Sequence, residues 1–101
     1  MKRKRKVFIS GRITGDPNYV EKFWQVERKL RYGYEVVNPC HLYLFGLPMV
    51  CYSWRTCMIV TVWNLIKCPM VFMLKDWKES RGARIEHRIA KLLFKKIYYQ
   101  L

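Results

Sequence analysis

Short apolar runs recur along the chain and are separated by longer, mixed segments. Continuous apolar runs without regular polar alternation are typical of parallel strands that are covered on both faces. We therefore predict four strands, and each is followed by a turn signal or by a segment with helical spacing. They are Val7–Ile9, Tyr34–Val37, Met70–Leu74 and Ile97–Tyr99.

The segment after the first strand predicts an amphipathic helix. Asp16 and Pro17 supply an N-cap followed by a proline at the first helical position, and Gly33 is expected to end the helix. Apolar residues then recur at helical spacing, which gives the helix one face for the core. These residues are Tyr19, Phe23, Val26 and Leu30.

Two further helices are predicted from their caps. Ser53 caps a helix that extends to about Lys67, and Ser80 caps a third helix near the end of the chain. The segment 40–52 is a long connection, of a length that often forms a functional lid. The inner stripe of the third helix is expected from Ile85, Ile89, Leu92 and Leu93.

The alternation of strands and helices defines an α/β fold. Right-handed crossovers favour a small parallel sheet in the order 2-1-3-4, with helices on both faces, as in a three-layer flavodoxin- or Rossmann-like sandwich. Ligands of such sheets bind where the strand order reverses, at the carboxyl ends of the strands. The loops 10–18 and 75–80 are therefore expected to form one crevice, with Gly11 and Gly15 on one wall and Arg81, Gly82 and Glu86 on the other.

Length and charge limit the possible partners. The chain has 101 residues, which suits a basic tail at 1–6 followed by a single domain at 7–101. Twenty Lys and Arg against seven Asp and Glu give a net charge of +13, so nucleotides, nucleic acid and membrane surfaces are all attracted. The longest apolar run, Met58–Ile66, is too short to span a bilayer, and no signal peptide follows the basic start. We expect a cytoplasmic protein with no membrane association.

The four cysteines do not form a metal-binding pattern. Cys40, Cys51, Cys57 and Cys68 include no CxxC pair and lie among apolar residues. This spacing indicates reduced thiols in a cytosolic protein and argues against a zinc site or a disulfide framework. We expect neither a metal nor a cofactor.

Five blocks of the sequence carry a family resemblance, and they follow one another in the family's order. The blocks are VFISGRITGDPNY at 7–19, GYEVVNP at 33–39, LP at 47–48, SW at 53–54 and DWKESRGARIE at 76–86. In these blocks the chain resembles the DUF4406 family and is similar to the nucleoside 2-deoxyribosyltransferase superfamily.

The resemblance implies a catalytic residue and an anion site. A glutamate on the helix after the third strand attacks the anomeric carbon of a (deoxy)ribosyl group in the superfamily, and Glu86 matches that position. A carboxylate suits this step because it stabilises an oxocarbenium-like transition state and can form a glycosyl ester. Beside it, the Ser80 hydroxyl, the Arg81 guanidinium and the helix N-terminus would bind a phosphate or sugar, while Gly82 permits close approach.

The opposite wall would hold the rest of a nucleoside or nucleotide substrate. Ser10, Gly11 and Arg12 follow the first strand and would contact the base or sugar. Among the four tryptophans, Trp54 and Trp77 lie nearest the expected crevice and could stack on a base. The implied reaction is hydrolysis or exchange at the N-glycosidic bond.

Departures from the family pattern keep a second function open. Arg55, Thr56 and Pro69 stand where the family usually has acidic residues, so an acid that protonates the leaving base could be missing. Asp76, Glu79 and His41 remain as candidates for that role. The alternative is a catalytically degenerate protein that binds a nucleotide or nucleic acid through its basic surface. Glu86 would then only pair with a neighbouring arginine.

The second helix suggests self-association. From Cys57 to Ile66 it has almost no polar face, although a helix on one side of a small sheet should have one. Related transferases assemble as oligomers, so the resemblance points the same way. We expect a homo-oligomer, and specifically a homodimer that buries the outer face of this helix.

Overall fold

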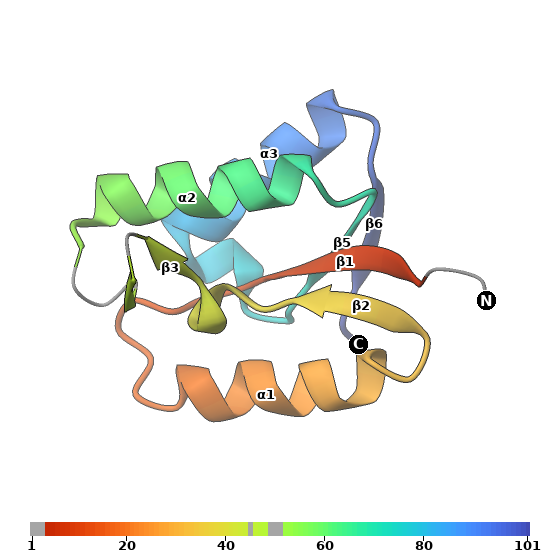
Figure 1. Ribbon diagram of the computed structural model, residues 1–101, viewed down its shortest axis with the longest axis horizontal. Helices are drawn as coiled ribbons and strands as arrows, with labels where there is room; N and C mark the ends of the chain where they lie inside the picture. Colours follow the sequence, from red (N-terminus) through yellow and green to blue (C-terminus); the bar gives the residue numbers. More distant parts are fainter. Residues whose placement is uncertain (1–3, 45, 49–51) are drawn as a thin grey trace.

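The structure is a computed structural model that describes residues 4–44, 46–48 and 52–101 (Figure 1). The start of the basic tail and Cys51 lie outside the described residues. The chain forms β1 (Arg5–Ser10), α1 (Tyr19–Leu30), β2 (Tyr34–Val37), the 3₁₀ turn η1 (Pro39–His41), β3 (Tyr43–Leu44), β4 (Leu47–Pro48), α2 (Trp54–Ile66), β5 (Met70–Met73), the 3₁₀ turn η3 (Trp77–Glu79), α3 (Arg81–Leu92) and β6 (Lys96–Tyr99).

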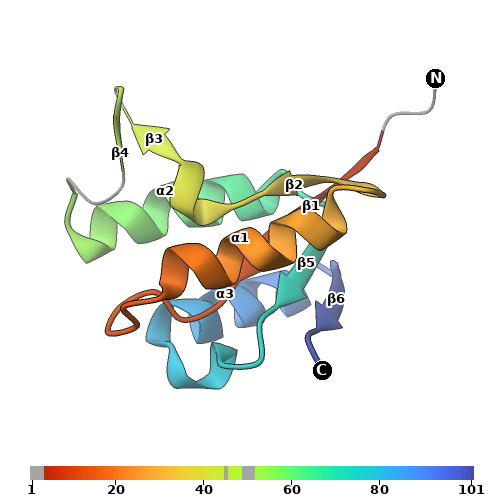
Figure 2. The same cartoon turned by 90° about the horizontal axis from the view of Figure 1, so that it is seen from below.

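Four of these strands form one parallel sheet in the order β2-β1-β5-β6. Counted along the chain without the short hairpin, this is the predicted order 2-1-3-4, and the α/β sandwich is confirmed. Helix α1 lies against one face of the sheet, and α2 and α3 lie side by side on the other (Figures 1 and 2). The order reverses between β1 and β5, where their neighbours lie on opposite sides.

The sheet is buried on both faces, which explains the continuous apolar runs. Phe8 and Val71 pack towards α2 and α3 in a cluster with Leu65. Ile9 packs towards α1 in a second cluster with Phe23. Adjacent residues of one strand therefore serve different layers, as the pleat of a strand requires.

The start of α1 differs from the prediction. Its N-cap is Asn18, so the helix begins after Asp16 and Pro17 instead of at them. Asp16 accepts a hydrogen bond from the backbone N–H of Asn18 at 2.9 Å, which forms a turn ahead of the helix. An aspartate can satisfy nearby backbone groups in a turn as well as in a cap, and here the turn is preferred. The predicted caps Ser53 and Ser80 are both confirmed.

The inner face of α3 also differs. Leu92 and Leu93 were expected in the core, but 70% and 47% of their surfaces are exposed. The buried face is formed by Gly82, Ala83, Glu86 and Ala90. The two leucines lie where the helix ends and the chain turns back to β6, beyond the part of α3 that covers the sheet. Small residues allow the remaining turns to pack closely on the sheet, and Glu86 is therefore drawn into the interior.

The connection after β2 has structure that the sequence did not predict. Strands β3 and β4 pair antiparallel, with Leu44 opposite Leu47. Gly46 between them has a φ of +79°, a conformation that favours glycine. The hairpin follows η1, whose residues Pro39 and Cys40 reach the cavity described below.

Helix α2 exposes large apolar side chains, as its sequence predicts. Ile59, Trp63 and Ile66 are 71%, 61% and 46% exposed and share one side of the helix. Among the residues that the structure describes, no helix has the length and apolar character needed to cross a bilayer.

Gly11, directly after β1, provides a test of the close packing behind the cavity. A Cβ at this position would lie 2.6 Å from Leu74 Cδ1 and 2.8 Å from Leu74 Cβ. Leu74 is fully buried and cannot move away. We expect Gly11→Ala to lower the free energy of unfolding by about 1–3 kcal/mol in chemical denaturation.

The matched control is Gly33→Ala, because a Cβ at Gly33 would meet no atom within 4 Å. This variant should stay within about 1 kcal/mol of the wild type. Equal stabilities of the two variants would contradict the close approach of Gly11 to Leu74.

Candidate functional site

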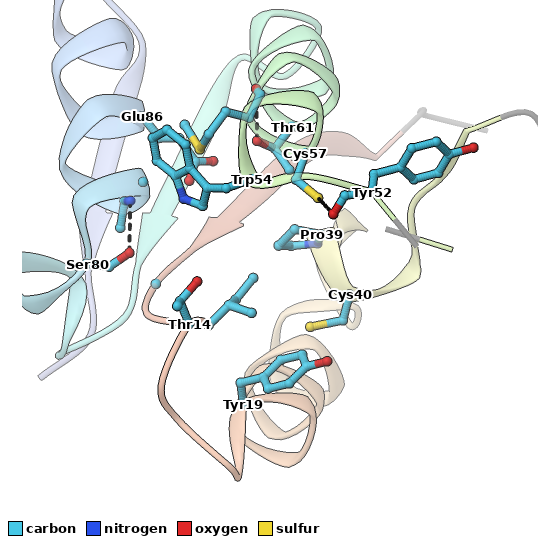
Figure 3. Close-up of a pocket in the computed structure, with 15 residues that line it drawn as sticks. Thr14, Tyr19, Pro39, Cys40, Tyr52, Trp54, Cys57, Thr61, Ser80 and Glu86 are labelled. Carbon is cyan, nitrogen blue, oxygen red and sulfur yellow. Dashed lines mark hydrogen bonds between the residues drawn. The ribbon is translucent and has the colours of Figure 1, made fainter. Parts of the chain in front are cut away.

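A cavity of about 390 Å³ lies at the carboxyl ends of β1 and β5, between the loop after β1, helix α2 and the start of α3 (Figure 3). This volume is within the range of about 300–1,000 Å³ that is usual for small-molecule sites. In Figure 3, Glu86, Trp54 and Ser80 lie on one side, and Tyr19 and Cys40 lie on the other. Its lining residues are Gly11, Ile13, Thr14, Tyr19, Pro39, Cys40, Tyr52, Trp54, Cys57, Met58, Thr61, Ser80, Gly82, Ala83 and Glu86.

Glu86 is the only carboxylate among the described residues that line the cavity. It lies in the second turn of α3, on the face that packs against the sheet, and is only 7% exposed. The Ser10 hydroxyl donates a hydrogen bond to its Oε1 at 3.3 Å. Its Oε2 is buried and has no hydrogen-bond partner within the described part of the chain. A buried carboxyl oxygen without a partner is costly, and it is suited to a ligand that supplies the missing contact.

Burial raises the pKa of Glu86 to about 8, and the hydrogen bond from Ser10 only partly offsets this effect. Removing the carboxylate from water disfavours its charged form, and none of the described cations is paired with it. With this pKa, about one tenth of the molecules carry a charged Glu86 at pH 7. At neutral pH the carboxyl group of Glu86 is therefore mostly protonated.

The start of α3 supplies polar groups beside Glu86. Ser80 Oγ accepts a hydrogen bond from the backbone N–H of Ala83 at 3.2 Å, so its own O–H remains available as a donor. A Cβ at Gly82 would lie 3.0 Å from Met58 Sδ, so this glycine allows α3 to approach α2 closely. Ser80 and Gly82 both line the cavity.

Arg81 lies at the edge of the site. Its side chain is not part of the lining, but its guanidinium lies over the ring of Trp54, 4.9 Å from the centroid. Trp54 does line the cavity and is 40% exposed. Arg81, on the outer surface of α3, therefore contacts a residue of the cavity lining.

Arg12 does not line the cavity. Its backbone N–H donates to Asp76 Oδ1 at 3.2 Å, and its side chain lies 3.8 Å from Glu79 Oε2. These contacts join the loop after β1 to the loop after β5. The two loops meet, as the predicted crevice required, but Arg12 contributes to their connection and is directed away from the lining.

Lys22 strengthens the same connection. Its ammonium group contacts Asp16 Oδ2 at 2.6 Å, donates to the carbonyl of Arg12 at 2.8 Å and pairs with Asp76. Desolvation alone would lower the pKa of Lys22, but the hydrogen bonds to Asp16 and Asp76 raise it. The hydrogen bond with Lys22 lowers the pKa of Asp16. These ion pairs join the loops beside the cavity, and none of the three charged side chains lines it.

Trp77 lies outside the lining. Its ring stacks on His87 at a centroid distance of 4.1 Å and lies 6.1 Å from the ring of Tyr99. His87 Nε2 and the Tyr99 hydroxyl form a hydrogen bond of 2.7 Å. These contacts place Trp77 among side chains of α3 and β6, and of the two tryptophans expected to stack on a base only Trp54 lines the cavity.

The other candidate acids also lie outside the cavity lining. Asp76 is paired with Lys22, and Glu79 is exposed beside Arg12. His41 is exposed and lies 3.5 Å from Glu27. None of the three is close enough to the lining to form part of it. Within the described residues there is also no cluster of three or more His, Cys, Asp or Glu side chains that could hold a metal ion.

Sequence reasoning missed most of the wall formed by α2. Cys57 and Thr61 line the cavity at successive four-residue steps from the cap Ser53. The signal was a polar stripe on an otherwise apolar helix, since residues four apart share one face. Cys40, Cys57 and Cys68 are thiols without disulfides, and burial raises the pKa of Cys40 to about 11. The wall residues Tyr19 and Tyr52 had no distinguishing signal.

Comparison with known proteins supplies a family and no activity. No curated protein matches the sequence. The family model described as "Domain of unknown function (DUF4406)" matches residues 5–99, which is nearly the whole chain and includes every residue of the cavity lining. The chain therefore belongs to the DUF4406 family.

Proposed function

We propose that the protein cleaves the N-glycosidic bond of a nucleoside or nucleotide, as a hydrolase or as a (deoxy)ribosyltransferase, with Glu86 as the nucleophile. The observation that carries this proposal is that Glu86 lines a cavity of about 390 Å³ and that its buried Oε2 has no hydrogen-bond partner among the described residues. The resemblance to the nucleoside 2-deoxyribosyltransferase superfamily supports the same assignment.

The reaction follows from the chemistry of a carboxylate. The charged Glu86 attacks the anomeric carbon, and the bond between that carbon and the base nitrogen breaks with its electron pair left on the base. A glycosyl ester of Glu86 forms. Water or a second base then attacks the same carbon and releases Glu86 as a carboxylate. The leaving base takes up a proton from water or from a donor in the cavity.

The cavity contains donors for the base, although they are weak acids. The Cys57 thiol already donates to the carbonyl of Tyr52, whereas burial raises the pKa of Cys40 to about 11, so this thiol keeps its proton at neutral pH. Thr14 and Tyr19 add hydroxyl groups on the same side. Hydrogen bonds from such groups would assist departure of the base less than a carboxylic acid would. We therefore expect slow turnover relative to an enzyme with a second acid.

The test is incubation with a panel of ribo- and deoxyribonucleosides and their 5′-phosphates, with free base measured by chromatography. Release from at least one member, in proportion to enzyme concentration, is expected. Added free base of a second kind should yield an exchanged nucleoside if the protein is a transferase. Release of no base from any member would refute the proposed activity.

The pH dependence of the reaction gives a sharper expectation. Glu86 must be charged to attack, and its pKa is about 8. We expect kcat/KM to rise about tenfold per pH unit below pH 8 and to level off above it. Ser10→Ala removes the hydrogen bond that lowers this pKa, so the midpoint should move to higher pH. A rate that falls as pH rises through 8 would instead make Glu86 an acid.

The second candidate function is binding without turnover. It is favoured by the lack of a second carboxylate among the described lining residues. In this case the protein would bind a nucleotide and release no base. Salt titration separates the possible ligands, because affinity for a nucleic acid through many phosphates falls steeply with salt and affinity for a single phosphate does not.

We further propose that two copies associate through α2. The exposed side chains of Ile59, Trp63 and Ile66 are apolar, and the core of a homodimer interface is depleted in charge. We expect light scattering to give the mass of a dimer, and Trp63→Glu to give that of a monomer. Tyr32→Glu, which alters an exposed aromatic residue beyond α1, should leave the dimer intact. A monomeric wild type at high concentration would overturn this proposal.

A further inference from the structure

The outer surface of α3 carries a row of cations. Arg81, Arg84, Arg88 and Lys91 follow one another at steps of three or four residues, which places them on one side of the helix. All four are exposed, and none forms an ion pair within the described part of the chain. Like charges at this spacing destabilise a helix. A row of cations without ion-pair partners among the described residues is therefore suited to an anionic ligand.

The acidic residues are distributed so that this face stays positive. Helix α2 has none, and α3 has only Glu86, which is buried. The six others lie in α1, in β2 or in the loops after β1 and β5, and several are already paired with cations. They are Asp16, Glu21, Glu27, Glu35, Asp76 and Glu79. The face formed by α2 and α3 therefore attracts anions.

The row of cations leads to the cavity. Arg81, its first member, lies over the ring of Trp54, and Trp54 lines the cavity. From Arg81 to Lys91 the helix covers about 15 Å. A chain of phosphates along α3 would therefore end at an exposed aromatic ring and an arginine. Aromatic rings of this kind stack on bases, and arginine adds a cation–π contact.

We propose that the row Arg81–Arg84–Arg88–Lys91 binds the backbone of a single-stranded nucleic acid, so that the cavity receives a nucleotide that is part of a strand. The chemical step rests on the function proposed above, whereas the binding does not. A single strand is favoured over a duplex because its bases need no unpairing before one of them can enter the cavity beneath Trp54.

The binding is tested by fluorescence anisotropy with a labelled oligothymidylate over a range of salt concentrations. Arg84 and Arg88 are replaced together by alanine, since neither belongs to the cavity lining. The matched control replaces Arg28 and Lys29 of α1, which removes the same charge from the opposite layer. At about 50 mM salt we expect Arg84→Ala/Arg88→Ala to weaken binding by about tenfold or more. The slope of log K against log salt should become shallower by about 1.4.

The control should bind as tightly as the wild type, with the same slope. Equal losses in the two double variants would overturn the proposal, since only net charge would then matter. Absence of salt-dependent binding would also overturn it. Binding to phosphatidylserine vesicles, lost in Arg84→Ala/Arg88→Ala and without oligonucleotide binding, would assign the row to a membrane surface instead.

Turnover separates this proposal from the catalytic one. Arg84→Ala/Arg88→Ala should leave base release from a free mononucleotide unchanged and should reduce release from the oligonucleotide. If no substrate releases a base, the anisotropy measurement still decides whether the row binds a strand. If base is released from mononucleotides and the oligonucleotide does not bind, the catalytic function stands and this inference fails.

Discussion

Glu86→Gln should abolish base release, with a loss of about 10³-fold or more in kcat. The amide has nearly the shape of the carboxyl group but cannot form a glycosyl ester, so the covalent route is closed. KM should change little if the polar groups of Ser80 and the start of α3 still hold the substrate. Removal of a group that acts only in the transition state lowers kcat and kcat/KM together.

The matched control for this loss is Glu21→Gln. Glu21 is an exposed carboxylate on α1 that contacts Gln25 and does not line the cavity. Its conversion makes the same change from a carboxyl group to an amide and should leave the rate of base release unchanged. A Glu86→Gln variant with the rate of the wild type would remove Glu86 from the mechanism.

The same substitution should stabilise the fold at neutral pH. The pKa of Glu86 is about 8 in the folded protein and near the ordinary 4.5 in the unfolded chain. Between these values the folded state holds a proton that the unfolded chain releases, so the free energy of unfolding falls as pH rises. The stability is fully present below pH 4.5 and has decreased by about 3 kcal/mol at pH 7. Glutamine has no such proton to lose.

Urea denaturation at several pH values measures this effect. The stability of Glu86→Gln relative to the wild type should grow by about 3 kcal/mol between pH 4 and pH 7. Other titrating groups, such as Asp16 with its lowered pKa, are common to both proteins and cancel in the difference. Parallel curves for the two proteins would show that Glu86 has an ordinary pKa in the free protein. A stability gain with a loss of activity is the usual consequence of replacing a functional group whose burial destabilises the fold.

The sheet and the position of its crevice could be predicted from the sequence because apolar runs and caps are local signals. The runs at 7–9 and 70–73 lie in strands that helices cover on both faces. Side chains on both faces of such a strand pack in the interior, so its sequence is a continuous apolar run. In a sheet of the order 2-1-3-4, the loops after β1 and β5 lie side by side. Their connection through Arg12 and Asp76 is consistent with that topology.

Features that depend on packing distance could not be predicted. The helical spacing of Leu92 predicts a core residue, but Leu92 is exposed because the last turn of α3 lies beyond the core. No local sequence pattern indicates where the sheet beneath a helix ends. The burial of Glu86 also depends on packing, in this case on how closely α3 lies to the sheet. Its helix lies close to the sheet because Ala83 and Ala90 are small, and the carboxyl group is buried with it. The position of Trp77 depended on partners in β6 that no spacing indicates.

The most direct measurement of the central claim is the mass of the protein after rapid acid quenching during turnover, followed by peptide mapping. The account predicts a glycosyl adduct on the peptide that contains Glu86, and no adduct on Glu86→Gln. Base release without any adduct, or an adduct on another residue, would contradict the role of Glu86 as the nucleophile.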